Sequence, residues 1–471
     1  MVREMITLQV GQCGNQIGRR FWATLLHEKA AEAKADGKYD AAMSAFFRNV
    51  DGRYEPALDL DARLCSIGTP LASLRARAIL VDTEEGVVAE TLRDPVFGEL
   101  FDATQLVTDV SGAGNNWAHG HAVYGPQYGG EIDDAVRTEL ERCDSPQSFF
   151  VLHSMGGGTG SGLGSYLMEQ LHDTYPELCR FSVAIYPSAD DDVITSPYNA
   201  VLATQSLTHY ADCVVPMENA ALLDVARRAN DLVDRAAGAK PPAAKSKAQG
   251  FDEVNDVAAH LLSHLTAGAR FSGALNIDVN ELATNLVPFP KMHYLTAGYA
   301  PVLPGHQRKS VLDVRDARDV AQSTRQVQRL FAEACSPLRR VVRAPEVATR
   351  SEVHLACALL GRGDVVASDV NCAIERLKTT MRMPRWNPDG FKVGLCSAPP
   401  LAAPRAVLCL QNATSISSTF SALRDRFHLL YRRKAMLHHY TQYVDAERFD
   451  DALNDLDELI ESYAEAQRNC A

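Results

Sequence analysis

Several common sequence patterns are missing from this chain of 471 residues, and each absence excludes a class of protein. No apolar run reaches membrane-spanning length, and the N-terminus has charged residues in a strand pattern instead of the apolar core of a signal peptide. The 11 cysteines form no C-x-x-C pair and no readable zinc site. We therefore expect a soluble intracellular protein with reduced thiols, many of them buried, as at Cys357, Cys396 and Cys409.

Basic residues are also in deficit, because 47 Lys and Arg stand against 59 Asp and Glu, which gives a net charge of −12. This balance argues against a general nucleic-acid binder and is compatible with a soluble assembly protein. The apolar and charged fractions are ordinary for a globular protein. The length suggests two to four domains, and no internal repeat is evident.

Glycine is concentrated in one stretch, His153–Gly162, which reads HSMGGGTGSG. An apolar run at residues 149–152 precedes it and a helical pattern at residues 163–171 follows. Glycines let a backbone approach a ligand closely, and their N–H groups suit a phosphate at a helix N-terminus. The stretch is neither a Walker P-loop nor a G-x-G-x-x-G fingerprint. A structural turn is the alternative.

Further strands alternate with helical segments, which predicts a parallel sheet covered by helices on both faces, with ligand loops at one edge. We expect these strands at Met5–Val10, Ala78–Asp82, Phe149–Leu152, Phe181–Tyr186 and Cys213–Pro216.

Two loops follow strands in this part of the chain. Gly11–Gln16 is expected to be a loop with a second phosphate-facing turn, before a helix from Ile17 to about Lys34. Asp82–Gly86 carries carboxylates that could hold Mg²⁺ through water, or could form an ordinary solvated turn.

The second half of the chain has a different character. Asn219 opens a helix to about Ala236, and Val254–Leu265 is expected to be a buried connecting helix. Between residues 290 and 412 we expect a mixed α+β domain with helices near 320–334 and 368–382. Its strands are expected at Met292–Tyr299, Val353–Leu360, Phe391–Ser397 and Ala406–Gln411.

Two long C-terminal helices are expected, one through Phe420–Tyr440 and one through Ala446–Ala466. The first helix carries a series of basic residues that form either a solvated face or a partner-binding ridge: Arg424, Arg426, Arg432, Arg433 and Lys434.

Several motifs together resemble the tubulin superfamily over nearly the whole chain. They are the glycine loop Gly156–Gly162, Met1–Trp22, Ser111–Trp117, Asn285–Pro290 and Tyr431–Tyr440. Within the family, Tyr39–Asp51 and Asp190–Asn199 are most similar to epsilon-tubulin.

The resemblance implies an α/β tubulin fold in four segments. A Rossmann-like GTP-binding domain occupies residues 1–236, and a basic Pro/Ala/Lys-rich inserted loop occupies 237–250. The core helix and intermediate domain occupy 251–412, and a C-terminal helical domain without an acidic tail occupies 413–471.

The resemblance also implies a GTP or GDP site with Mg²⁺. Asn219 and Asn255 would read the guanine, because an Asn side chain offers both donors and an acceptor. Phe251 would stack on the base where the family has Tyr, Asp192 would lie on the ribose side, and Glu84 would be associated with Mg²⁺. The expected phosphate-side residues are Gln12, Cys13, Ala113, Gly114, Asn115, Ser154, Gly158, Thr159 and Gly160.

A second set of residues, Glu281 with Asp278, resembles the alpha-like element that acts on the nucleotide of a neighbouring subunit. Glu281 would orient the attacking water for phosphoryl transfer, and Asp278 would assist. Hydrolysis of GTP to GDP, if the chain is active, would then be completed in trans on assembly. An ordinary acidic residue favoured by the helix dipole is the alternative for Glu281.

Three departures from the family pattern affect these expectations. Ser196 stands where many tubulins have a ribose-binding Glu, and the Lys240–Gly250 insertion precedes the base-stacking segment. The chain as given ends at residues 468–471 without a glutamate-rich tail. We therefore do not expect binding of partners that depend on such a tail.

The resemblance favours a GTP-binding tubulin of the epsilon type that forms or stabilises compound microtubules in the cytoskeleton, at centrioles and basal bodies. The expected partners are other tubulins, through longitudinal contacts, and centriole or basal-body proteins, with no nucleic acid and no membrane. The alternatives are a general structural microtubule subunit of alpha-like kind and a GTP-bound scaffold that does not hydrolyse nucleotide.

Overall fold

The computed structural model describes residues 3–32, 43–50, 74–95, 97–188, 191, 193–237, 247–271, 273–302, 320–401 and 403–470. The side chains of residues 231–237, 247–250 and 320–324 are not part of that description. Asp192 and residues 238–246 of the expected inserted loop lie outside the described residues.

A six-stranded sheet forms the first half of the structure, with the strand order β5-β4-β1-β6-β7-β8. All neighbouring strands are parallel, which confirms the predicted parallel sheet. In that order the strands are Leu106–Thr108, Ala78–Asp82, Glu4–Val10, Pro146–Ser154, Cys179–Tyr186 and Cys213–Glu218. The carboxyl ends of these strands therefore meet at one edge.

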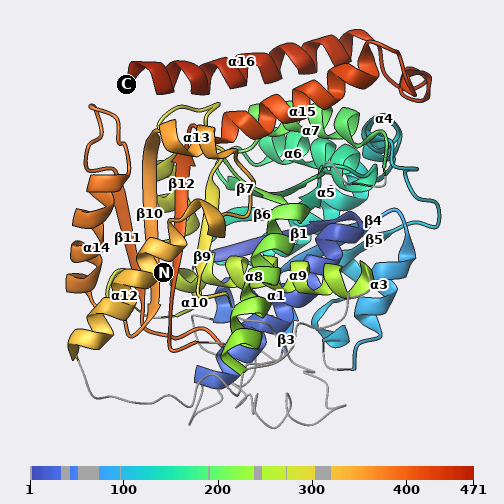
Figure 1. Ribbon diagram of the computed structural model, residues 1–471. Helices are drawn as coiled ribbons and strands as arrows, with labels where there is room; N and C mark the ends of the chain where they lie inside the picture. The colour runs from blue at the N-terminus through green and yellow to red at the C-terminus, as the bar shows by residue number, and fades with distance from the viewer. Residues whose placement is uncertain are drawn as a thin grey trace.

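Helices cover both faces of this sheet (Figure 1). Side chains alternate along β1, so that Met5 enters one core while Ile6 and Leu8 enter the other. The first core contains α1 (Gly11–Glu32), α8 (Asn219–Ala237) and α9 (Lys247–Leu265). The second contains α5 (Gly125–Glu141), α6 (Gly164–Thr174) and α7 (Ser196–Tyr210).

A smaller mixed sheet follows, with the order β11-β10-β12-β9. Its strands are Phe391–Cys396, His354–Gly363, Arg405–Ala413 and Thr296–Ala300, and only the β10–β11 pair is parallel. One face packs on α12 (Val320–Ala334) and α14 (Ala367–Thr380). The other packs on α9 and α11 (Val279–Leu286) within the first core. The fold is therefore the α/β arrangement expected, with α9 buried between the two sheets.

Two C-terminal helices, α15 (Ile416–Tyr431) and α16 (Glu447–Asn469), cross the outer side of α7 (Figure 1). The buried Tyr198 of α7 contacts the rings of Phe427, Tyr440 and Phe449, with centroids 5.3–5.6 Å apart. The expected helix to residue 440 was wrong, because α15 ends at Tyr431 and two later residues, 434 and 436, have positive φ. Non-Gly residues rarely adopt that conformation, which marks a turn.

Two other expectations are corrected. The predicted loop at Gly11–Gln16 is helical, because Gly11 with φ of 73° makes the whole turn and α1 begins there. The expected inserted loop ends earlier than Gly250, because α9 begins at Lys247. The remaining short elements are β2 (Phe47–Asn49), β3 (Leu74–Ala76), α3 (Glu85–Leu92), α4 (Trp117–His119), α10 (Ala267–Arg270) and α13 (Glu346–Ser351).

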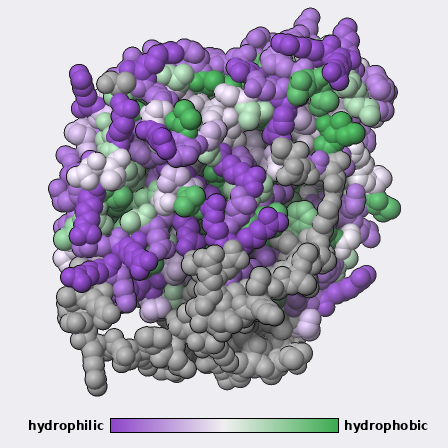
Figure 2. Space-filling model, viewed as in Figure 1, coloured by the Kyte–Doolittle hydropathy of each residue, from purple (hydrophilic) through white to green (hydrophobic). Residues whose placement is uncertain are grey.

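The surface in the same view is mostly hydrophilic, with apolar residues in small separate groups (Figure 2). Among the described residues, no helix combines the length and apolar character needed to cross a membrane.

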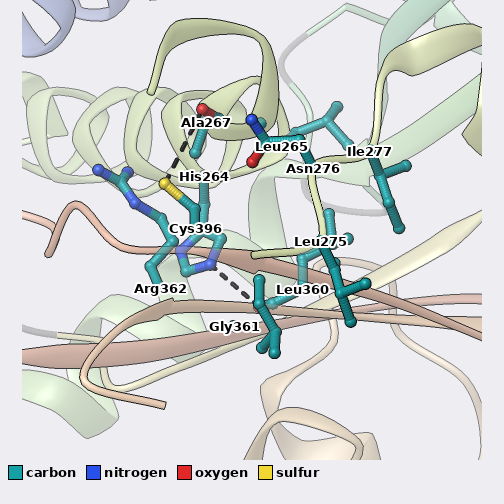
Figure 3. Close-up of a pocket in the computed structure, with 13 residues that line it drawn as sticks. His264, Leu265, Ala267, Leu275, Asn276, Ile277, Leu360, Gly361, Arg362 and Cys396 are labelled. Atoms are coloured by element: carbon teal, nitrogen blue, oxygen red, sulfur yellow. Dashed lines mark hydrogen bonds between the residues drawn. The ribbon is translucent and has the colours of Figure 1, made fainter. Parts of the chain in front are cut away.

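A buried group of charges joins the two halves of the structure. Glu28 of α1 pairs with Arg270 and with Arg362 of β10, each at 2.9 Å, and all three side chains are almost completely buried. Burial raises the pKa of Glu28, but Arg362, Arg270 and a hydrogen bond from Ser263 lower it to about 2. Figure 3 shows Arg362 beside Cys396 and His264, at a small pocket between the end of α9 and the mixed sheet.

Glu28→Gln is expected to destabilise the protein by about 3–5 kcal/mol, because Arg270 and Arg362 would remain buried without their shared counter-charge. The free energy of unfolding in urea measures this. The control is Glu90→Gln, which breaks a largely exposed pair with Arg19 and should cost less than about 1 kcal/mol. Equal losses in the two variants would contradict the role of Glu28.

Candidate nucleotide-binding site

Two glycine turns face each other at the carboxyl ends of β1 and β6. A Cβ added to Gly11 would lie 3.0 Å from the backbone nitrogen of Gly160, and one on Gly160 would lie 2.9 Å from that of Ser154. Gly14 lies against β6 in the same way, with 2.2 Å to the carbonyl oxygen of Leu152. These positions accept no side chain, so the first turn of α1 and the glycine loop can lie backbone against backbone.

The glycine loop runs from Ser154 through a π-helical turn, Thr159–Leu163, into α6. A Cβ on Gly158 would lie 2.7 Å from the Asn116 nitrogen and 2.8 Å from the Ala113 Cβ, so a third loop, residues 111–116, lies against it. By contrast, a Cβ on Gly157 would meet nothing closer than 3.9 Å, and one on Gly114 nothing within 4 Å. The loop backbones are therefore in contact on one side and open on the other.

Asn199 of α7 holds these loops together. Its amide nitrogen donates to the carbonyl oxygens of Asn115 and Gly156, both at 2.8 Å. Its amide oxygen accepts from the Trp117 backbone nitrogen at 2.9 Å and the Tyr440 hydroxyl at 2.6 Å. Asn199 is fully buried, and its bonds with Trp117 and Tyr440 form away from water, while those to Asn115 and Gly156 are partly buried. One side chain thus fixes two candidate phosphate loops and the segment after α15.

Gln12 and Cys13 occupy the first turn of α1, next to the glycine loop. Gln12 is exposed, so its amide is free to reach a ligand. Burial raises the pKa of the Cys13 thiol to about 12, so Cys13 is a neutral thiol and not an anion that would repel phosphate.

The end of β4 brings carboxylates to the same edge. The Thr83 hydroxyl lies 2.6 Å from that of Thr159, and a Cβ on Gly112 would lie 2.1 Å from Oε1 of the exposed Glu84. Asp82 is buried, and its Oδ2 has no hydrogen-bond partner within the described part of the chain. Burial raises the pKa of Asp82 to about 6.

An unpaired buried carboxylate oxygen beside an exposed carboxylate fits a divalent cation, since Mg²⁺ is bound by one or two carboxylates together with phosphate oxygens and water. Asp82 and Glu84 are the residues that could hold it.

The expected base-side residues lie on adjacent helices of the first core. Asn219 is the half-buried first residue of α8, and Asn255 is buried in α9. Helix α9 lies beside α1, where Arg20 pairs with Asp252 at 2.7 Å. Phe251, one residue before Asp252, is half exposed, as a ring available for stacking must be. Ser196 is buried at the start of α7.

Glu281 and Asp278 lie at the opposite end of the sheet. Asp278 caps α11 by accepting from the Glu281 nitrogen at 2.6 Å, and it pairs with Arg3 at the start of β1. Asn280 donates to the carbonyl oxygen of Gln147, at the beginning of β6. The glycine loop follows the other end of β6, and the seven steps from Gln147 to Ser154 span roughly 23 Å of extended strand. The structure therefore keeps these acids far from the phosphate loops of the same chain.

Comparison with known proteins agrees with this geometry. Residues 4–227 match the GTPase domain of the Tubulin/FtsZ family, and residues 290–425 match the tubulin C-terminal domain. The chain belongs to the tubulin family. Its first half is thus a tubulin GTPase domain, and the loops at the sheet edge belong to a GTP-binding protein.

Individual tubulins match nearly end to end. The tubulin epsilon chains of Mus musculus and Homo sapiens are each 43% identical over 98% of this chain and over 96% and 95% of their own lengths. The tubulin alpha-1 chain of Saccharomyces cerevisiae is 32% identical over 98% of this chain and 97% of its own. This tubulin is therefore more similar to those epsilon chains than to that alpha chain.

Sequence reasoning missed the role of Asn199 in this site and did not single out Asp82 among the carboxylates after β4. Asn199 is one of several polar residues in its helix and gives no signal of its own, because its four partners are distant in sequence. Asp82 was expected only as one of several carboxylates that could hold Mg²⁺, and its burial, which the sequence does not show, distinguishes it from the exposed Glu84.

In buffer without added Mg²⁺, Asp82→Asn is expected to be more stable than wild type, and the difference should grow as the pH rises. The folded-state pKa of Asp82 is raised from 3.8 to about 6, so its contribution to stability is present below pH 4 and lost as the pH passes 6. Above pH 7 the variant should gain up to about 3 kcal/mol over wild type, with no gain near pH 4. Unfolding free energies across this range measure the effect, and a gain that does not change with pH would contradict it.

Proposed function

We propose that this tubulin is a GTP-binding subunit of the epsilon type that forms or stabilises the compound microtubules of centrioles and basal bodies. The observation that carries the proposal is the 43% identity to two tubulin epsilon chains over 98% of the chain. Its location would be the cytoplasmic cytoskeleton, and its partners would be other tubulins, through longitudinal contacts, together with centriole or basal-body proteins.

In this proposal one guanine nucleotide lies at the carboxyl edge of the six-stranded sheet. The open backbone at Gly114 and Gly157 supports phosphate binding there, since a Cβ on Gly114 would meet nothing within 4 Å and one on Gly157 only the Asn115 Oδ1 at 3.9 Å. The other phosphate-side residues are Gln12, Cys13, Ala113, Asn115, Ser154, Gly158, Thr159 and Gly160. Asn219, Asn255 and Phe251 bind the base, and Asp192 is assigned to the ribose. Asp82 joins Glu84 as a Mg²⁺-associated acid.

Hydrolysis is proposed to occur between subunits. Glu281 is 40% exposed and pairs with Lys392 at 3.3 Å, so its carboxylate is available at the surface. Asp278 is a positioning residue, because its hydrogen bond to the Glu281 nitrogen fixes the first turn of α11. The separation along β6 supports action on the nucleotide of a neighbour, since Glu281 cannot reach across its own sheet.

Two alternatives make different predictions. A general structural subunit of alpha-like kind would grow filaments readily with a beta-type tubulin. A non-hydrolysing scaffold would retain intact GTP even in the presence of a partner. Polymerisation of the purified protein, followed by mass analysis of its nucleotide, separates both from the proposal.

Replacing Asn219 and Asn255 by Ala should weaken guanine nucleotide binding strongly. Each lost contact leaves a polar base edge unpaired, at about 1–3 kcal/mol, or roughly 5- to 150-fold in Kd. Nucleotide retained after gel filtration and titration with labelled GTP measure this. Asn230→Ala is the matched control, because its amide donates to Glu253 at 3.4 Å within the helix pair α8–α9. Full affinity in the double variant would mean that the base lies elsewhere.

Glu281→Gln should leave the chain's own bound nucleotide unchanged while lowering GTP hydrolysis by a partner tubulin by about 10²-fold or more. Single-turnover hydrolysis in mixed assemblies measures this. Glu458→Gln is the control, because Glu458 forms a comparable exposed pair with Lys291 at 3.0 Å and should leave hydrolysis at the wild-type rate. Wild-type stimulation by the Glu281 variant would rule out the catalytic role.

A further inference from the structure

Three cysteines from different elements meet beneath α12. Cys335 follows the last residue of α12, Cys357 lies in β10 and Cys409 in β12. The Cys335 and Cys409 sulfurs are 3.1 Å apart, and those of Cys357 and Cys409 are 3.6 Å apart. Cys335 is the only one of the three that is not fully buried. The cluster thus has one member at the edge of the core and two inside it.

The two possible partners of Cys409 differ in geometry. Cys357 is in register with Gln411, so Cys357 and Cys409 are diagonal neighbours on one face of a regular antiparallel pair. The backbones of β10 and β12 are held there by ladder hydrogen bonds, which limits their approach. Cys335 lies at a helix end, where the chain leaves α12 for the segment 336–339. The contraction of about 1 Å that a bond of 2.05 Å requires is therefore easier from Cys335.

The surroundings favour reactivity at the same pair. The Gln411 amide donates to the Cys409 sulfur at 3.0 Å, and Arg340 in turn donates to Gln411 at 2.9 Å. Burial raises the pKa of Cys409, but the donors Cys335, Cys357 and Gln411 and the charge of Arg340 outweigh it and lower the pKa well below its ordinary value. The lowered pKa favours the thiolate form of Cys409, which is the form that attacks a sulfenic sulfur, whereas the hydrogen bond to Cys409 and burial raise the pKa of Cys335. Cys335 is still the member of the cluster that a peroxide can reach, because it is the one that is not fully buried.

We propose that Cys335 and Cys409 are a thiol pair that a hydroperoxide converts into an intramolecular disulfide. The Cys335 sulfur attacks one oxygen of hydrogen peroxide and the O–O bond breaks. The products are a sulfenic acid at Cys335 and one molecule of water, which takes up the thiol proton. Cys409 then attacks the sulfenic sulfur, the S–O bond breaks, and the hydroxyl group leaves with a thiol proton as a second water. The two thiols lose two electrons, which reduce one peroxide to two waters.

The bond would tie the end of α12 to the central strand β12 of the mixed sheet. The segment that follows Cys335 includes Pro337, Leu338 and Arg340, which form one wall of a cavity of about 750 Å³. Ser188 and Glu218, the residue before Asn219, line the same cavity. Oxidation would therefore restrict a segment that faces the nucleotide-binding half of the molecule.

Mass spectrometry of the full chain tests the proposal. The reduced protein is treated with a small excess of hydrogen peroxide, free thiols are alkylated, and the protein is digested with trypsin without reduction. Cleavage after Arg329, Arg350 and Arg405 places Cys335, Cys357 and Cys409 in separate peptides, so the linkage is unambiguous. The expected product links the peptides of Cys335 and Cys409, disappears with dithiothreitol, and is accompanied by a reversible rise in Tm of a few degrees.

Two variants complete the test. Cys335→Ser should abolish both the linked peptide and the rise in Tm, whereas Cys372→Ser, at an exposed thiol of α14, should keep both. A Cys357–Cys409 link, sulfinic acid at Cys335 without a link, a disulfide between two molecules, or a Tm rise that persists in Cys335→Ser would each overturn the proposal.

Discussion

The closeness of three backbone loops is the constraint on which the rest of this structure depends. The turn at Gly11, the loop at residues 111–116 and the glycine loop after β6 approach to distances that a single Cβ would prevent. Backbone N–H groups can surround a phosphate only when the chain itself comes this close. Asn199 then holds the arrangement with four hydrogen bonds from one buried amide. The geometry of the three loops is therefore fixed by glycines at the contact points and by Asn199, which is distant from them in sequence.

The parallel sheet decides how the site can work. Because all six strands point the same way, every loop after a strand meets at one edge, and every segment before a strand meets at the other. Asp278 pairs with Arg3 before β1, and Asn280 contacts Gln147 at the start of β6, which places Glu281 at that other edge. In the proposed mechanism, a chain built in this way would carry both parts of a hydrolytic site without being able to bring them together. Head-to-tail contact between two subunits would join them, as heterologous contacts generally allow.

Much of this could be predicted from the sequence, and what failed did so for physical reasons. The buried strands at residues 78–82, 149–152 and 181–186 are continuous apolar runs. Such runs predict parallel strands well, because a parallel strand is buried on both faces of its sheet. The turn before α1 was misjudged, because one left-handed glycine replaced a six-residue loop. The role of Asn199 depends on partners far along the chain, and the raised pKa of Asp82 depends on its burial, and no local pattern contains either. The basic series expected on the first C-terminal helix divides in the same non-local way. Arg424 and Arg426 lie on α15, where Arg424 pairs with Asp457 and Arg426 donates to the carbonyl oxygens of Pro187 and Ser188. Arg432, Arg433 and Lys434 follow the end of α15 and are exposed.

The core helix α9 gives the two halves of the molecule a common support. One side of it packs against α1, whose first turn faces the glycine loop, and the other packs against the mixed sheet. Glu28 adds a polar link along the same route, because it binds Arg362 of β10 from within α1. Close packing transmits displacement, since closely packed side chains leave few voids that could absorb it. A movement of α1 against its ligand would therefore reach the mixed sheet through α9 and the Glu28–Arg362 pair, two contacts that are independent of the flanking helices α15 and α16.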